Sequence, residues 1–139
     1  MKKFLIAAAM VLAAATQGNA MDSLSQFDWS KRVLVLFGDP QNGKLQEQVR
    51  LLREQKTGLA EREMVVLQVS GNDVHVVFGD AKPVNAGQLR TEADAESDGF
   101  EAVLVGKDGG VKLRSKQVVS DVEMFDLIDR MPMRRAGRG

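Results

Sequence analysis

The chain contains no cysteine and a single histidine among its 139 residues. Without a thiolate it carries out no thiol–disulfide exchange and no thiol-based peroxide reduction, and it forms no disulfide. A zinc site needs several Cys or His ligands, so a lone histidine excludes that class of site as well. The fold must therefore be stabilised by its apolar core, and any function must rest on other side chains.

Long apolar runs are also missing, apart from one at the start of the chain. Residues 4–15 are apolar and follow the basic start Met1-Lys2-Lys3, and small residues stand at Gly18 and Ala20, where signal peptidase recognises its substrate. The alternative, an uncleaved membrane anchor, needs ~20 apolar residues, and this run is shorter. We expect residues 1–20 to be a signal peptide cut after Ala20, and the protein to be periplasmic or secreted.

Charge of one sign is not in excess, since 19 basic residues balance 19 acidic ones. Loss of Lys2 and Lys3 with the leader makes the balance slightly negative. A nucleic-acid-binding domain carries a clear excess of Lys and Arg, so nucleic acid is not an expected partner. The length indicates one domain, which we assign to residues 21–135, followed by a short tail over residues 136–139.

Apolar and polar stretches alternate along this domain as in an α/β protein with a mixed sheet. We expect strands over residues 32–37, 63–69, 74–78, 100–105 and 111–114. We expect helices over residues 44–56 and 87–96, and a last one from Ser120 to Pro132. Because residues 33–37 are apolar at every position, the first strand should be central and covered on both faces. Residues 107–110 should form a hairpin turn.

The same pattern predicts where helices begin and which faces they bury. Asn42 can cap the first helix, and Gly58 stands where a helix stop is expected. The expected buried stripe of that helix is Leu45, Val49 and Leu52. Ser120 and Glu123 form a capping box for the last helix. The expected buried stripe of the last helix is Val122, Phe125 and Ile128.

Four segments give the chain a family resemblance: residues 32–37 after Trp29, and residues 61–66, 100–114 and 125–135. In these segments it resembles the thioredoxin fold. More specifically, it is similar to an uncharacterised bacterial family, a domain of unknown function related to the thioredoxin-like domains of secreted sushi-repeat and coiled-coil matrix proteins. The resemblance implies a three-layer α/β/α sandwich without the Cys-x-x-Cys pair, and it implies no established activity. No proline stands directly before the strand that begins at Phe100, so the cis-proline of redox thioredoxins has no counterpart.

The turn over residues 38–44 offers one candidate site. It fits the Gly-x4-Gly-Lys pattern of a phosphate-binding loop, but Leu45 replaces the Ser or Thr that holds magnesium, and Pro40 removes a backbone donor. A plain strand-to-helix turn is favoured. An enzyme without cysteine chemistry is the alternative function, with Asp39 as base and Lys44 as electrostatic clamp at this turn.

Metal and cofactor sites are not expected. His75 alternates with valines on its strand, which favours a polar residue on a solvent-facing side over a catalytic one. Met131 and Met133 are soft donors for Cu(I), but two thioethers without a third ligand make a poor site. We assign no cofactor.

Basic residues crowd the expected hairpin and the end of the chain. They are Lys107, Lys112, Arg114 and Lys116 on the first, and Arg130, Arg134, Arg135 and Arg138 on the second. The last helix of a thioredoxin-like domain packs beside that hairpin, so the two groups are predicted to share a basic surface. The candidate binding residues on it are Lys107, Lys112, Arg114, Arg134 and Arg135. The preferred function is a non-catalytic binding module for an anionic periplasmic or surface partner; ordinary solvated charge is the alternative.

Overall fold

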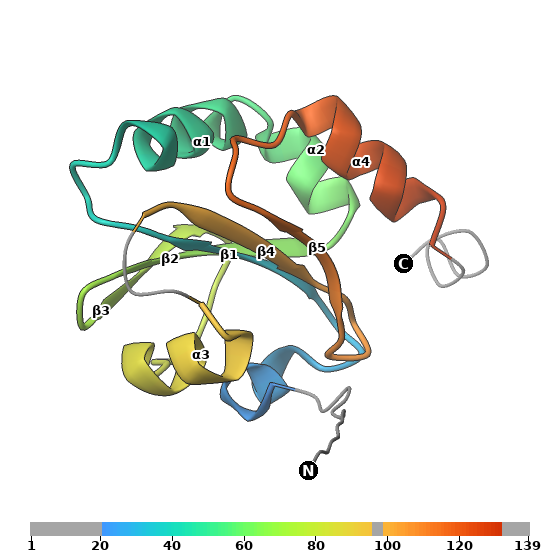
Figure 1. The fold of residues 1–139 in the computed structure, drawn as a ribbon. Coiled ribbons are helices and arrows are strands. Elements are labelled where there is room, and N and C mark those ends of the chain that lie inside the picture. Colours follow the sequence, from blue (N-terminus) through green and yellow to red (C-terminus); the bar gives the residue numbers. More distant parts are fainter. Residues whose placement is uncertain (1–20, 96–98, 132–139) are drawn as a thin grey trace, which may run out of the picture.

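The computed structural model describes residues 21–95 and 99–131. The expected signal peptide, the expected tail, Arg134 and Arg135 lie outside these ranges. The strands are β1 (Arg32–Phe37), β2 (Met64–Ser70), β3 (Asp73–Phe78), β4 (Glu101–Val105) and β5 (Val111–Ser115) (Figure 1). The helices are the 3-10 helix η1 (Asp22–Phe27), α1 (Gly43–Arg53), α2 (Lys56–Glu61), α3 (Ala86–Ala93) and α4 (Asp121–Asp129).

The five strands form one mixed sheet in the order β3-β2-β1-β4-β5. β1 and β2 run parallel, and the other neighbouring strands run antiparallel. β1 lies at the centre and is buried at each of its residues. The five strands expected from the sequence are thus confirmed, as is the central position of the apolar run at residues 33–37.

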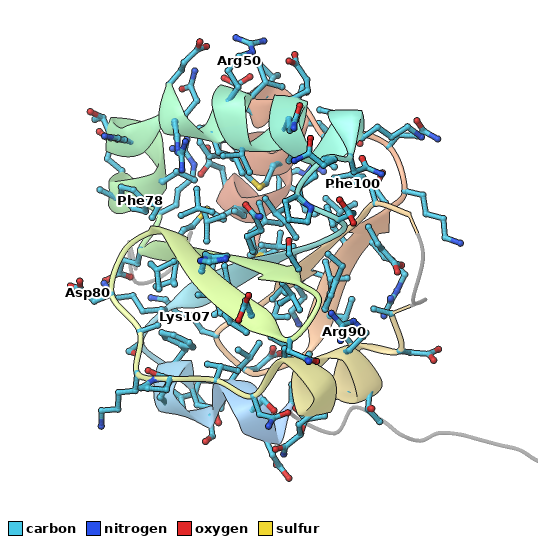
Figure 2. The ribbon with its side chains drawn as sticks, turned by 90° about the vertical axis from the view of Figure 1, so that its left-hand side faces the viewer. Arg50, Phe78, Asp80, Arg90, Phe100 and Lys107 are labelled. Carbon is cyan, nitrogen blue, oxygen red and sulfur yellow. The ribbon has the colours of Figure 1, made fainter. Side chains whose placement is uncertain are left out.

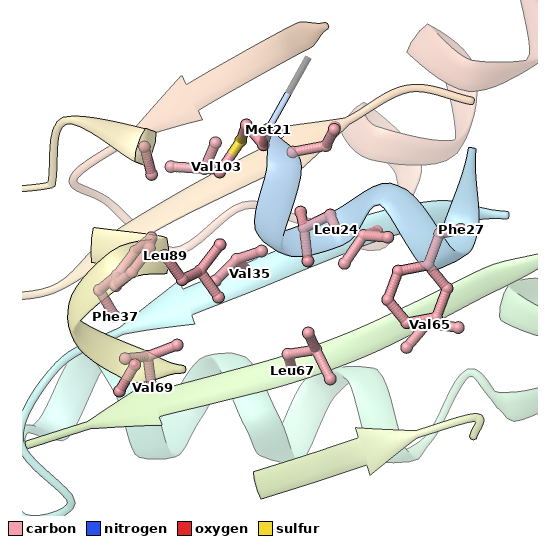
Figure 3. Close-up of a cluster of buried hydrophobic side chains, with 14 residues drawn as sticks. Met21, Leu24, Phe27, Val35, Phe37, Val65, Leu67, Val69, Leu89 and Val103 are labelled. Carbon is pink, nitrogen blue, oxygen red and sulfur yellow. The ribbon is translucent and has the colours of Figure 1, made fainter. Parts of the chain in front are cut away.

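Alternation along β1 sends its side chains into two separate layers of core. Val35 and Phe37 face η1 and α3 on one side of the sheet, and Figure 3 shows Leu24 and Leu89 packed against them. Leu34 and Leu36 belong to a core cluster with residues of α1, α2 and α4. Figure 1 shows these three helices on the other side of the sheet. The expected three-layer sandwich is therefore correct. The polar segment that precedes β1 gave no helical pattern in the sequence. It forms η1 because Leu24 and Phe27 become buried on the sheet.

The first helix differs from its prediction. Asn42 caps α1 as expected, with its Oδ1 accepting from the backbone N–H of Leu45 at 3.1 Å. The helix then ends at Arg53 and a second helix, α2, follows it. Gly58 is not a helix stop but lies inside α2, where an added Cβ would be 2.6 Å from Cε2 of Phe125. The glycine is thus required by the close approach of α4, which no local pattern reveals.

The buried face of α4 is also corrected. Ser120 caps the helix as predicted, its Oγ accepting from the backbone N–H of Glu123 at 3.1 Å. Val122, however, is 63% exposed, and the buried positions are Met124 and Ile128. The buried face of the helix begins at Met124, so Val122 remains in solvent, and Phe125 is only partly buried against the core.

Candidate functional site

The two groups of candidate residues lie at opposite ends of the sheet. The turn over residues 38–44 follows the end of β1, whereas the hairpin between β4 and β5 lies beside its start, because Val33 pairs with Val105 in antiparallel register. Figure 1 shows the turn before α1 at the left and the hairpin at the right. The topology therefore makes two separate sites of them.

The turn after β1 uses its polar groups to hold itself together. Asp39 Oδ1 accepts from the backbone N–H of Gln41 at 2.8 Å, which is the turn chemistry expected of it. Lys44 Nζ donates to the carbonyl of Lys116 at 3.4 Å. Among the described residues no hydrogen bond or ion pair joins Asp39 to Lys44. A pocket of about 450 Å³ lies here, lined by Asn42, Gly43, Lys44, Gly99, Phe100 and Lys116.

The hairpin end holds a second pocket, of about 470 Å³, which combines buried cations with an apolar wall. Its lining residues are Arg32, Gly106, Lys107, Asp108, Lys112, Leu127 and Met131, and we refer to it as the Arg32 pocket. The cations come from β1 and the hairpin, and the two apolar residues come from α4 and the residues just after it. α4 does pack beside the hairpin, as the resemblance implied.

Two of the cations are almost entirely buried. Arg32 is 1% exposed, and its Nη1 donates to the carbonyl of Arg62 at 2.8 Å. Lys107 is 7% exposed, and its ammonium forms an ion pair with Glu63. Burial of a charge is costly unless it is paired and hydrogen-bonded, so these contacts are what makes the arrangement possible.

The backbone around this pocket is strained at two places. Trp29 (φ 65°) and Glu63 (φ 54°) both adopt the left-handed conformation that non-glycine residues rarely take. The backbone N–H of Trp29 donates to the carbonyl of Lys107 at 2.7 Å, and that of Arg32 donates to the carbonyl of Glu63 at 3.0 Å. Such strain costs on the order of 1–3 kcal/mol per residue and gathers at functional sites. Here it positions Glu63 to reach Lys107.

Lys112 crosses the hairpin to form the rim of the pocket. Its Nζ pairs with Asp108 Oδ2 at 2.9 Å, and Asp108 Oδ1 accepts from the backbone N–H of Gly110 at the same distance. These hydrogen bonds, that of Lys112 first, hold the pKa of Asp108 below its ordinary value. An added Cβ at Gly106 would lie 2.5 Å from Lys112 Cε, so a larger residue there would displace the end of the lysine side chain.

The predicted shared basic surface is therefore divided. Lys107 and Lys112 meet in the Arg32 pocket, but Arg114 does not line it and instead pairs with Glu101 at 3.0 Å. Arg134 and Arg135 lie outside the described residues. Lys107 is also buried rather than solvent-facing, because the hairpin folds back against Glu63.

Residues 23–137 match the model of the domain of unknown function DUF4174. The chain belongs to this family.

Two other proteins are similar to this DUF4174 domain. Over 130 residues the chain is 28% identical to the coiled-coil domain-containing protein 80 of Danio rerio. The match covers 81% of this chain and 15% of that much longer protein. Among solved structures, the mitochondrial 2-Cys peroxiredoxin of Plasmodium falciparum superposes with a TM-score of 0.57 at 12% sequence identity, covering 84% of each chain. The DUF4174 domain thus has a thioredoxin-like fold, without any cysteine.

Arg32 and Glu63 are among the residues of this DUF4174 site that were missing from the sequence-based candidates. One signal was available for Arg32: an arginine begins a strand that is otherwise apolar and expected to be covered on both faces. An arginine in that place must find acceptors inside the fold. Glu63 gave no signal, because its importance comes from the backbone conformation that turns it toward Lys107. No helix in the described part of the chain combines the length and apolarity needed to cross a membrane.

The ion pair between Glu63 and Lys107 should make stability depend on pH. The hydrogen bond from Lys107 holds the pKa of Glu63 below its ordinary value of 4.5, and burial opposes this only in part. A carboxyl with a lowered pKa in the folded state contributes stability above its unfolded pKa, and the contribution is lost as pH falls through the folded pKa. Glu63→Gln should therefore lower the free energy of unfolding at pH 7, with a difference from the natural protein that narrows below pH 4.5.

Urea unfolding from pH 7 to pH 3 measures this difference directly. Asp126→Asn is the matched control, because Asp126 is an exposed carboxyl of α4 with no ion pair among the described residues. A Glu63→Gln deficit that stays constant across this range would show that the carboxylate charge is not what stabilises the hairpin.

Proposed function

We propose that this DUF4174 domain is a non-catalytic binding module that takes an anionic group of its partner, together with an adjoining apolar group, in the Arg32 pocket. The observation that carries the proposal is the meeting of Arg32, Lys107 and Lys112 beside the apolar side chains of Leu127 and Met131. A pocket of about 470 Å³ is within the size range of small-ligand sites.

Charge in and around this pocket favours an anion. Arg32, Lys107 and Lys112 bring three cations together here, and two of them have carboxylate partners in the described structure: Lys107 pairs with Glu63, and Lys112 pairs with Asp108. Lys112 is the most accessible of the three cations, because its partner Asp108 lies on the surface of the hairpin. An incoming carboxylate or phosphate thus competes with Asp108 for Lys112, while its apolar part lies against Leu127 and Met131.

The carboxylates beside the pocket are poorly suited to acid–base catalysis. The pKa values of Glu63 and Asp108 both lie below their ordinary values, so both groups are ionised and weakly basic at neutral pH. General acids and bases work best with a pKa near the operating pH. At the other end of the sheet, Asp39 accepts from the backbone N–H of Gln41 and Lys44 donates to the carbonyl of Lys116, so no observation favours the alternative of a catalytic turn.

The proposed export of the protein and the outer residues of the proposed site are inferred from the sequence. The basic start, apolar run and small residues of the leader support export with cleavage after Ala20, and hence a periplasmic or surface partner. We extend the proposed domain over residues 21–135. Arg134 and Arg135 follow Met131 closely in the chain and are proposed as further contacts for the anion; Arg114 is proposed as an outer contact on the same hairpin. Membership of a bacterial branch, and kinship with sushi-repeat proteins, rest on the same sequence resemblance.

The single tryptophan makes the proposal measurable. Trp29 is exposed, is hydrogen-bonded through its backbone to Lys107, and is the only Trp or Tyr of the chain, so its fluorescence reports on the hairpin end. Titration with octanoate, an apolar monoanion, should give a saturable change. Lys112→Glu should weaken binding about tenfold or more, which is ~1.4 kcal/mol. Raising salt from 0.1 M to 1 M should weaken it further, because the screening length falls from ~10 Å to ~3 Å.

Lys82→Glu is the control, since Lys82 is an exposed lysine in the loop before α3, which covers the opposite face of the sheet. A partner recovered by co-purification from a periplasmic extract should show the same ranking of the two variants. Equal binding by Lys112→Glu and Lys82→Glu, or binding that salt does not weaken, would contradict the proposal.

A further inference from the structure

The two edges of the sheet are built differently. The edge strand β5 carries Lys112 and Arg114, charges of the kind that keep an edge strand from pairing with another chain. The opposite edge strand, β3, has the sequence DVHVVF, without a single lysine, arginine or proline. The β5 edge thus carries two cations, whereas the β3 edge carries only Asp73 at its first residue and an irregular register between Val76 and Phe78.

The outer side of β3 is uncovered. Figure 2 looks onto this edge, and no other described segment passes in front of the strand. Among the described strands, β3 pairs only with β2. No backbone hydrogen bond from a described loop reaches the outer side of β3. Val76 is 44% exposed at the middle of the strand. Outward-facing backbone groups and an exposed valine are what an added strand would cover.

Charged residues stand at both ends of β3: Asp73 and Arg90 where the strand begins, and Asp80 where it finishes. At the end where the strand begins, Arg90 Nη2 donates to the carbonyl of Gly71 at 2.6 Å, which fixes the guanidinium beside the turn. At the end where the strand finishes, Asp80 is exposed and makes no hydrogen bond or ion pair with any described residue. Figure 2 shows the two side chains on either side of the strand.

We propose that β3 pairs antiparallel with β3 of a second copy of this chain across a two-fold axis near its middle, which joins the two sheets into one. Antiparallel pairing places the Asp80 end of each strand beside the Arg90 end of the other. The two-fold axis then forms this ion pair twice, as an isologous interface requires. An unrelated strand would have no reason to carry the same two charges at the same spacing, so the charges favour a second copy as the partner.

Each copy contributes one strand to the interface, which is therefore small. The dimer should be weak, and its population should depend on protein concentration. Sedimentation velocity of protein made from the full-length coding sequence, over a range of concentrations, should show a monomer–dimer equilibrium. Val76→Lys should raise its dissociation constant at least about tenfold, because it brings two like charges together at the axis. Val111→Lys is the matched control: Val111 is 43% exposed and lies on the other edge strand, so its change should leave the equilibrium unaltered.

A charge exchange tests the geometry. Asp80→Arg and Arg90→Asp should each weaken the dimer, and the double variant should recover it, since the ion pairs re-form with their signs reversed. Recovery distinguishes an interface contact from a mere loss of the Arg90 hydrogen bond within one copy.

The absence of native cysteine permits a direct trap. Residues opposite one another in antiparallel strands have Cα atoms about 4.5–5.5 Å apart, within the range that a disulfide spans. Under mild oxidation, Val76→Cys at the axis should therefore form a disulfide-linked dimer far faster than Val111→Cys. A natural protein that remains monomeric at all concentrations, or equal trapping through Val76→Cys and Val111→Cys, would overturn the proposal. So would a monomer that binds a foreign extended peptide along β3.

Discussion

Leu36→Asp should leave the chain without a cooperative unfolding transition. Leu36 is completely buried in the central strand and packs in the layer beneath α1 and α4. Residues of α1, α2 and α4 cover this face of the sheet, so the side chain has no route to solvent. A carboxylate placed there without a partner costs several kcal/mol or more, comparable with the ~5–15 kcal/mol that stabilise a whole domain. Circular dichroism during urea titration would show the loss.

Two further variants keep this prediction open to refutation. Leu36→Ala should remain folded but lose about 2–5 kcal/mol, the usual cost of truncating a buried leucine. Val122→Asp introduces the same carboxylate on an exposed residue in the first turn of α4, where the helix dipole favours negative charge, so stability should be kept. A stable Leu36→Asp protein, or a Val122→Asp protein that unfolds, would contradict the placement of these residues.

Gln48→Leu should destabilise the domain by a few kcal/mol although it replaces a polar side chain with an apolar one of similar size. Gln48 is buried in α1, where its Nε2 donates to the carbonyl of Val119 at 3.0 Å and its Oε1 accepts from the Val119 N–H at 2.8 Å. These two bonds fasten the segment between β5 and α4 to α1. Leucine would leave both backbone groups buried without partners, at about 1–3 kcal/mol each.

The matched control for this change is Gln46→Leu. Gln46 lies on the same helix but is exposed, and its Nε2 donates to the carbonyl of Pro40, which water can replace. Its loss should change the free energy of unfolding by no more than ~0.5 kcal/mol. Equal urea midpoints for the two variants would mean that the Gln48 contacts do not hold α4 in place.

The candidate site was only partly predictable from the sequence. Lys107 and Lys112 were found because a hairpin turn rich in glycine and lysine is a local pattern. Arg114 was grouped with them because it is close in the chain, but its carboxylate partner Glu101 holds it elsewhere. Arg32 and Glu63 entered the site only through the fold, since β1 and the residue before β2 meet the hairpin through contacts between distant parts of the chain.

Local patterns in the sequence were enough to predict the strands, the starts of α1 and α4, and the absence of cysteine chemistry. These depend on neighbouring residues: the apolar run of β1, the side chains of Asn42 and Ser120 that accept from the next turn, and the composition. Tertiary structure alone decided that Gly58 lies inside a helix and that Val122 stays in solvent. It also decided that Lys107 is buried against Glu63. The environment of each of these residues depends on which element, distant in the sequence, packs against it. Such packing cannot be predicted from the pattern of neighbouring residues.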